Sequence, residues 1–233
     1  MKILALDTST NMASVAVMDE NMVLGEYSLN QDLSHSENLV PMIKEVLDSL
    51  GLKVSDIDLY GVSIGPGSFT GLRISVATVK AFAHLFHKPI VGVSTLEALA
   101  FNLPYNNIVV PMIDARRDRV YTGIYSWKDN ELISLMKADA VEVDILLDKL
   151  DKDYKNIVVN GNGSLLHRER IREKLGSKVS FSSIGDNSSR ATSVGELALI
   201  KYNKGEVDNY YTLAPDYLRK SQAERQLNKK EQG

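Results

Sequence analysis

At Gly65-Pro66-Gly67-Ser68-Phe69-Thr70-Gly71-Leu72-Arg73, the sequence changes from a strand pattern to a helix pattern. The apolar run 59–64 precedes this glycine turn, and a long helical pattern follows it to Phe86. Ser68 and Thr70 can each cap the N-terminus of that helix. Three glycines and one proline within seven residues let the backbone come very close to a ligand or to another element of the chain.

The glycine turn does not match the standard phosphate-binding motifs. A P-loop places lysine directly after its last glycine, whereas Leu72 follows Gly71 here. A dinucleotide-binding fingerprint needs a glycine at the position of Thr70, and a nucleophile elbow needs glycines two residues either side of Ser68. A phosphate cradle and a tight strand-to-helix connection both stay open, and we favour the connection. The residues assigned to this structural motif are Gly65, Pro66, Gly67 and Gly71.

Composition sets the broad class of the protein. The chain has 233 residues, 44% apolar and 24% charged, which is typical of a soluble globular protein with one large or two small domains. A net charge of −3 gives no general attraction to nucleic acid or to an anionic membrane. The lack of cysteine excludes disulfides, thiol catalysis and zinc sites built on cysteine. With no signal peptide pattern and no run of about 20 apolar residues, we expect a cytoplasmic protein.

The apolar patterns repeat one order of elements: three strands, then helix, strand, helix, strand and helix. The first set has strands at 2–7, 13–19 and 23–29, a helix at 36–50, a strand at 58–64, a helix at 70–86, a strand at 89–93 and a helix at 95–102. A connector at 102–107 separates it from the second set. The second set has strands at 108–113, 119–127 and 131–137, a helix at 143–150, a strand at 156–160, a helix at 165–174, a strand at 178–182 and a helix at 191–203.

This order predicts an α/β fold of two tandem lobes, each a mixed sheet flanked by helices. Such a pair has the architecture of actin-like ATPases and sugar kinases, which is related to ribonuclease H. We place the first lobe at 1–103, a reduced second lobe at 104–215 and a flexible tail at 216–233. In that architecture a nucleotide lies between the lobes, and the turns at 7–12 and 114–118 would face its phosphates.

Four segments of the sequence together resemble the TsaB family, the non-catalytic partner in bacterial synthesis of threonylcarbamoyladenosine on tRNA. They are Leu6-Asp7-Thr8-Ser9-Thr10, the glycine turn, Asp114-Ala115-Arg116 followed by Val120-Tyr121, and Pro215-Asp216-Tyr217-Leu218-Arg219. The resemblance runs from residue 1 to about 220 and implies a homodimer alone, a heterodimer with the catalytic subunit TsaD, and contact with the ATPase TsaE. It implies tRNA contact only through the complex, no membrane, and no cofactor except a nucleotide at a composite interface.

The catalytic paralogue TsaD provides a control, because its chemistry needs residues that can be compared. Its metal is held by two histidines spaced H-x-x-x-H, and the matching positions here are Thr95 and Leu99. Its first hairpin turn carries an acidic pair where this chain has Asn11 and Met12. Its second turn has consecutive glycines, whereas residues 115–118 contain none. Three separate requirements fail, so the resemblance implies a protein that is not an enzyme.

A few polar residues keep alternative functions open. His84 and His87 have a helical ligand spacing, but a metal site needs three or four ligands, and His35 and His167 are distant in sequence. Asp7 is the best candidate for a nucleotide-site carboxylate, although we favour a structural role at the strand end. The arginines Arg116, Arg117 and Arg119 can bind phosphate, but no aromatic residues lie between them, which favours a solvated hairpin tip.

Two helices carry more apolar surface than one sheet contact needs. On helix 36–50 we assign Val40, Ile43, Leu47 and Leu50 to the core, and on helix 70–86 we assign Leu72, Val76, Val79, Ala83 and Phe86 to it. A wide core-facing arc stays open as an alternative. The remaining apolar stripes predict a helical interface with a partner. Its expected residues are Leu39, Met42, Val46, Ile74, Thr78, Ala81 and Leu85.

The sequence therefore predicts a scaffold that binds and stabilises TsaD and supports recruitment of TsaE. Two other classes of function stay open beside it. One is an ATP-dependent phosphotransferase with a degenerate phosphate site, which nucleotide binding by the isolated chain would favour. The other is a metal-dependent hydrolase, which a stoichiometric bound metal would favour.

Overall fold

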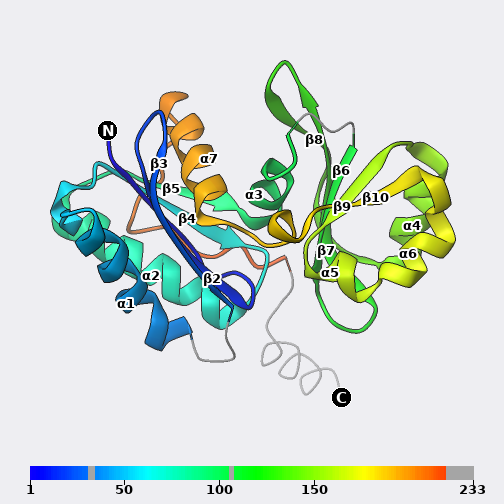
Figure 1. Ribbon diagram of the computed structural model, residues 1–233, viewed down its shortest axis with the longest axis horizontal. Coiled ribbons are helices and arrows are strands. Elements are labelled where there is room, and N and C mark those ends of the chain that lie inside the picture. The colour runs from blue at the N-terminus through cyan, green and yellow to red at the C-terminus, as the bar shows by residue number, and fades with distance from the viewer. Residues whose placement is uncertain (31–34, 105–107, 219–233) are drawn as a thin grey trace.

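The computed structural model describes residues 1–30, 35–104 and 108–218, and Figure 1 shows them in two lobes. Each lobe is built around one five-stranded mixed sheet. The predicted fold class, two tandem α/β lobes of the actin-like type, is confirmed. No described helix is long and apolar enough to cross a membrane.

The first sheet has the strand order β3-β2-β1-β4-β5, with β1 antiparallel to β2 and parallel to β4. Its central strands are apolar on both faces, because helices cover both sides of the sheet. The edge strand β3 is only partly buried. The strands are β1 (Ile3–Asp7), β2 (Met12–Met18), β3 (Val23–Asn30), β4 (Leu59–Gly65) and β5 (Ile90–Ser94).

The second sheet repeats this topology, with the order β10-β9-β6-β7-β8. Strands β7 and β8 form a long hairpin whose two-residue turn is Asp129-Asn130, and both residues have positive φ, at 51° and 62°. Aspartate and asparagine tolerate this left-handed conformation, which suits a tight hairpin. The strands are β6 (Ile108–Asp114), β7 (Arg119–Lys128), β8 (Glu131–Glu142), β9 (Ile157–Asn160) and β10 (Val179–Phe181).

Two predicted elements of the second lobe were wrong in their extent. The strand predicted to stop at 137 continues to Glu142, because β8 stays paired with β7 along its length, up to Arg119 opposite Glu142. The helix predicted at 165–174 is two helices, α5 (Asn162–Leu166) and α6 (Arg168–Leu175), separated by the non-helical His167. The break lets the apolar side chains of α6 reach the core of the second lobe.

Helices cover both faces of each sheet. On the first sheet, α1 and α2 pack on one face and α7 on the other; on the second, α4 and α6 pack on one face and α3 on the other. These helices are α1 (His35–Ser49), α2 (Phe69–Phe86), α3 (Thr95–Phe101), α4 (Val143–Asp153) and α7 (Ala191–Asn203).

The two lobes exchange one helix each. Helix α3 follows a strand of the first sheet, yet its buried Leu96 and Leu99 pack against the second sheet. Helix α7 follows the second sheet, yet Val194 and Ala198 pack against the first. A division of the chain at 103/104 therefore separates the strands but not the helices, and it stays a prediction as a domain boundary.

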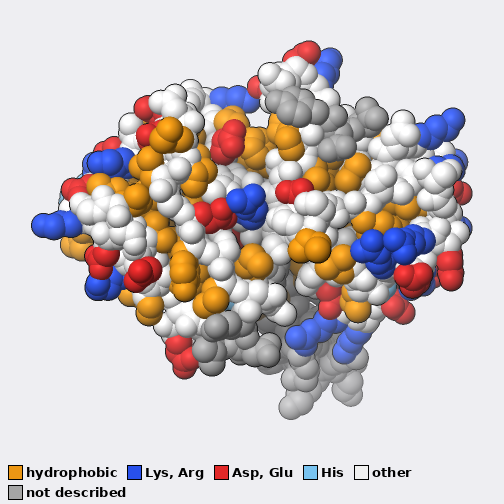
Figure 2. Space-filling model, viewed as in Figure 1, with side chains coloured by type: hydrophobic (Ala, Val, Ile, Leu, Met, Phe, Trp, Pro, Cys, Tyr) orange, Lys and Arg blue, Asp and Glu red, His pale blue; other side chains and the backbone are white. Residues whose placement is uncertain are grey.

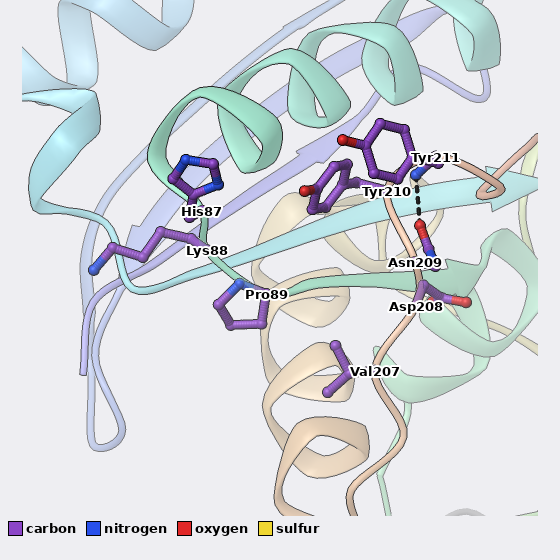
Figure 3. A pocket seen from close by; sticks show the side chains of 8 residues that line it. All are labelled: His87, Lys88, Pro89, Val207, Asp208, Asn209, Tyr210 and Tyr211. Carbon is purple, nitrogen blue, oxygen red and sulfur yellow. Dashed lines mark hydrogen bonds between the residues drawn. The ribbon is translucent and has the colours of Figure 1, made fainter.

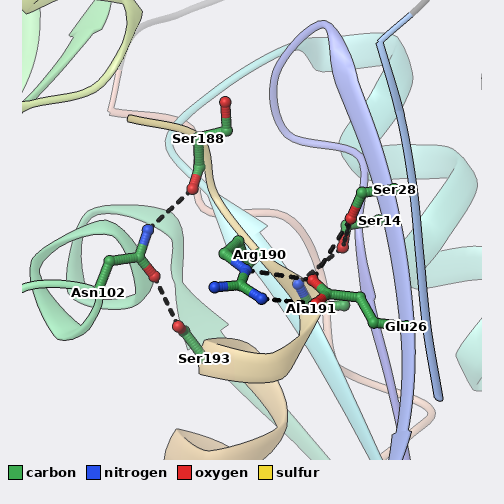
Figure 4. A network of polar contacts seen from close by, with 8 residues as sticks. All are labelled: Ser14, Glu26, Ser28, Asn102, Ser188, Arg190, Ala191 and Ser193. Atoms are coloured by element: carbon green, nitrogen blue, oxygen red, sulfur yellow. Dashed lines mark hydrogen bonds and ion pairs between the residues drawn. The ribbon is translucent and has the colours of Figure 1, made fainter. Parts of the chain in front are cut away.

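Hydrogen bonds fasten the segment before α7 to the first lobe (Figure 4). The guanidinium of Arg190 donates to both carboxylate oxygens of Glu26, at 2.6 and 3.3 Å. The side-chain amide of Asn102 donates to the carbonyl of Ser188 at 2.9 Å and accepts from the hydroxyl of Ser193 at 2.6 Å. Two crossing points of the chain are thus joined through partly buried polar groups.

Close packing of α7 on the first sheet predicts a specific sensitivity at Gly61 on β4. A Cβ atom there would lie 2.9 Å from the Cβ of Ala198. We expect Gly61→Val to lower the free energy of unfolding by about 1–3 kcal/mol through overpacking, measured by urea denaturation. Gly185→Val is the control, because a Cβ at Gly185 meets only the Ser183 hydroxyl, at 3.9 Å. Equal urea midpoints for the two variants would contradict this account of the helix–sheet contact.

Candidate functional site

The glycine turn joins the C-terminal end of β4, an internal strand of the first sheet, to the start of α2. The Gly65-Pro66 peptide bond is cis, and Ser68 caps α2, its hydroxyl accepting from the backbone N–H of Gly71 at 3.2 Å. The helix begins at Phe69. Of the two caps that the sequence offered, the structure uses Ser68.

The glycines are needed because the turn lies against the end of β1. A Cβ on Gly67 would be 2.2 Å from the carbonyl oxygen of Ser9, and one on Gly71 would be 1.9 Å from that of Thr8. Hydrogen bonds hold this contact: the Thr8 hydroxyl donates to the Gly71 carbonyl at 2.7 Å, and the Ser68 N–H donates to the Ser9 carbonyl at 2.7 Å. The close approach is to the protein's own backbone.

The face of Gly65 is covered by the last described residues of the chain. A Cβ on Gly65 would lie 2.6 Å from the carbonyl oxygen of Asp216, and its φ of +124° is one that only glycine adopts readily. The N–H of Asp216 donates to the carbonyl of Ile64 at 2.7 Å. Asp216 and Tyr217 thus contact the glycine turn, while residues 219–233 of the predicted flexible tail lie outside the described residues.

Asp7 is fully buried at the end of β1, and its carboxylate is saturated with hydrogen bonds. One oxygen accepts from the N–H and the hydroxyl of Ser9, at 2.8 and 2.6 Å. The other accepts from the hydroxyls of Ser63 and Ser189. These bonds join β1, β4 and the segment before α7, so Asp7 has the structural role that the sequence favoured.

The second predicted phosphate turn, residues 114–118, has a left-handed backbone in place of glycines. Arg116, Arg117 and Asp118 all have positive φ, at 62°, 58° and 54°, and Asp114 holds the turn by accepting from the Arg116 N–H at 2.7 Å. Three successive left-handed residues other than glycine are costly, by roughly 1 kcal/mol each. Arg116 and Arg117 point their charges to solvent, as expected of a solvated hairpin tip.

The residues at the metal positions of the catalytic paralogue are core residues here. Thr95 and Leu99 on α3 are 0% and 1% exposed. His84 and His87 lie at the surface with ring centroids 6.4 Å apart. Within residues 1–30, 35–104 and 108–218, no group of three or more histidine, cysteine or acidic residues is placed to hold a metal ion.

The predicted interface residues divide between core and surface. On α1, Leu39, Met42 and Val46 are only 0–6% exposed and belong to the core, so their assignment outside the core was wrong. Val40, assigned to the core, is 58% exposed. Helical residues lie about 100° apart, and the apolar arc is centred on Leu39 and Ile43, which leaves Val40 at its edge.

Helix α2 matches its prediction more closely. Its core stripe is buried as expected, apart from the partly exposed Phe86. Ile74 and Thr78 are half-buried, and Ala81 and Leu85 are exposed, Leu85 by 67%. Five accessible residues of this helix pair are here called the α2 face. It consists of Val40, Ile74, Thr78, Ala81 and Leu85.

The sequence did not point to two cavities away from the glycine turn. A cavity of about 480 Å³ lies at the C-terminal end of α2, with Lys88, Tyr210 and Tyr211 in its lining (Figure 3). Lys88 forms an ion pair with Asp58 at 3.0 Å. The pKa of Asp58 is lowered first by the N–H of Lys2 and then by this ammonium group.

The second cavity, about 210 Å³, lies between α7 and the β7–β8 hairpin, where Figure 2 shows a notch in the molecule. Two ion pairs bracket it: Lys201 with Glu97 at 3.1 Å, and Lys204 with Glu131 at 3.0 Å. Tyr125 contributes to its lining, and burial raises the pKa of this phenol. Lys88 at the first cavity, and Lys201 and Lys204 at the second, already have ion-pair partners.

Comparison with known proteins identifies the family. A family model described as "TsaD: tRNA N6-adenosine threonylcarbamoyltransferase" matches residues 22–227. The tRNA threonylcarbamoyladenosine biosynthesis protein TsaB of Bacillus subtilis (strain 168) is 33% identical over 225 residues, which cover 96% of each chain. The chain belongs to the TsaB family. The resemblance stated from the four sequence segments is therefore confirmed.

Solved structures agree with membership of the TsaB family. YeaZ from Pseudomonas aeruginosa matches with a TM-score of 0.79 and 27% identity, over 93% of this chain and 99% of that chain. The ROK hexokinase from Thermus thermophilus matches with a TM-score of 0.52 and 10% identity, over 88% of this chain and 100% of that chain. The hexokinase shares the fold alone, so it assigns no chemistry.

The contact of the glycine turn with β1 predicts that Gly71 tolerates no side chain. In Gly71→Ala the new methyl group would overlap the Thr8 carbonyl, which belongs to a buried turn. We expect the free energy of unfolding to fall by about 3 kcal/mol or more. Differential scanning calorimetry should then show a Tm lower by roughly 6–12 °C. Gly185→Ala, in an open exposed turn, should leave Tm within about 2 °C. Similar melting of both variants would show that the turn adapts.

Proposed function

We propose that this chain is a non-catalytic scaffold subunit in the synthesis of threonylcarbamoyladenosine on tRNA. It binds TsaD, stabilises that subunit in a competent conformation, and supports recruitment of the ATPase TsaE. The isolated chain forms a homodimer through the same helices, and tRNA is contacted through the assembled complex. Family membership supports the pathway, and the α2 face supports the mode of action.

The α2 face carries this proposal. Ile74, Thr78, Ala81 and Leu85 follow one another at intervals of about one helical turn. An apolar stripe therefore runs along the accessible side of α2. The small side chains of Ala81 and Thr78 let a partner helix approach closely. The Thr78 hydroxyl already donates to the Ile74 carbonyl at 2.8 Å, so burying it leaves no unsatisfied donor.

The buried polar groups support a role without catalysis. The carboxylate of Asp7, which a nucleotide enzyme of this fold would need near its ligand, accepts four hydrogen bonds from the protein itself. The adjoining backbone carbonyls of Thr8 and Ser9 face the glycine turn. The phosphotransferase and hydrolase alternatives gain no supporting observation from the described residues.

A charge on the α2 face should separate binding from folding. We expect Ala81→Arg to keep the Tm of the chain, because the site is exposed. In the complex the guanidinium would be buried without a partner, at a cost of several kcal/mol, so TsaD affinity should fall by about 100-fold or more. A pull-down with TsaD and threonylcarbamoyl transfer to tRNA in a reconstituted reaction measure the two effects.

Two further variants calibrate that experiment. Glu173→Arg, on an exposed site of α6 in the second lobe, should bind TsaD normally. Met42→Glu should unfold the chain, because Met42 is 3% exposed in the core, and it therefore cannot test the interface. Full tRNA modification by well-folded Ala81→Arg protein would refute the role of the α2 face.

The isolated chain should not turn over ATP. The reason is that Asp7 and the turn beside it are bonded within the protein, leaving no free carboxylate at the end of β1. We expect no phosphate release above buffer across the size-exclusion peak of the purified protein. Turnover that follows this peak and disappears in Asp7→Asn would favour the phosphotransferase alternative instead.

A further inference from the structure

After α7 the chain returns along α2 in the opposite direction. Figure 1 shows this C-terminal segment, residues 206–218, crossing the first lobe and ending between the two lobes. Lys80 of α2 donates to the carbonyls of Leu213 and Tyr211, at 2.8 and 3.4 Å, and the ring of His84 lies 5.6 Å from that of Tyr211. Side chains on one flank of α2 thus fasten the segment, beside the α2 face.

The strongest contacts come at the end of the segment. The ring of Tyr217 stacks on Phe69 with centroids 4.3 Å apart and an interplanar angle of 6°. Arg73, one turn further along α2, donates from Nε to the Tyr217 hydroxyl at 2.9 Å, and its guanidinium lies 5.7 Å from the ring centroid. Tyr217 therefore has a shaped site that recognises both its ring and its hydroxyl.

The backbone on either side of Tyr217 is also recognised. Asp216 donates its N–H to Ile64 at the end of β4, and its carbonyl fits against the bare face of Gly65. Leu218 packs on the hydrophobic cluster of the second lobe that contains Ala115 and Tyr121. Three successive residues, here called the latch (Asp216–Leu218), therefore contact both lobes.

The place of the latch matters as much as its contacts. The parallel strands β1, β4 and β5 end at Asp7, Gly65 and Ser94, and ligands of open α/β sheets bind in the crevice outside such carboxyl ends. Here the latch lies against the C-terminal end of β4, at Ile64 and Gly65. The segment thus takes the position of a ligand.

We propose that the glycine turn, Phe69 and Arg73 form a binding site for an extended peptide with a tyrosine, filled by the chain's own latch, which holds the two lobes together. The glycine turn then serves two contacts at once. Gly67 and Gly71 receive the end of β1, and Gly65 receives the latch. Since this inference concerns the isolated chain, it is independent of the proposed scaffold function.

Hydrogen exchange on the full-length chain tests the latch. In Tyr217→Ala, backbone amides of 213–218 and of 110–121 in the second lobe should exchange about tenfold faster, because loss of the stack releases Leu218 as well. Tyr217→Phe keeps the stack and loses only the exposed hydrogen bond from Arg73, so its exchange should lie closer to the parent chain than to Tyr217→Ala. Val207→Ala is the matched control, since Val207 is 47% exposed on the same segment.

A second measurement tests recognition of the tyrosine in trans. The synthetic peptide APDYLRKSQ, residues 214–222, is added at about 5 mM to the Tyr217→Ala chain, above the millimolar effective concentration of a tethered segment. It should slow exchange at 65–73 relative to the same variant without peptide, and the peptide with alanine for tyrosine should not. Unchanged exchange at 110–121 in both Tyr217→Ala and Leu218→Ala would overturn the latch between lobes. Equal effects of the two peptides would overturn the tyrosine site.

Discussion

The structure depends on one contact in which backbone lies directly against backbone, where the glycine turn meets the end of β1. Neither Gly67 nor Gly71 has room for a single methyl group, because the carbonyls of Ser9 and Thr8 occupy that space. This contact fixes where α2 begins relative to the sheet, and so fixes the direction of the α2 face. The second lobe repeats the solution, with Gly161 lying against the carbonyl of Met112.

Around this contact the lobes become interdependent. Each sheet would lack cover on one face without the helix that the other half of the chain supplies, α7 for the first sheet and α3 for the second. The buried carboxylate of Asp7 accepts a hydrogen bond from Ser189, which lies just before α7, so the end of β1 also secures that crossing. A group that could have served a ligand is committed to holding the lobes in place.

Helix α2 divides its surface among three tasks. Its core stripe, including Val76 and Val79, packs on the first sheet. A second flank, with Arg73 and Lys80, binds the returning C-terminal segment. Leu85 lies on the third side, which is accessible to a partner. The surface of α2 outside its core stripe therefore serves more than one contact. Only the part that the C-terminal segment leaves accessible is available for assembly.

The sequence by itself determined the two-lobed fold, the family and the order of elements apart from the break between α5 and α6, because apolar periodicity and the glycine turn are local patterns. It also separated the faces of α2 well, since the core stripe there is long and regular. It misplaced Val40 and Met42 on α1, because a broad apolar arc does not show which edge meets the sheet. Only the tertiary structure decided what the glycines approach, which lobe α3 and α7 cover, and where Tyr217 lies. Those contacts join residues far apart in the chain, and no local pattern encodes which distant surface fills a given space.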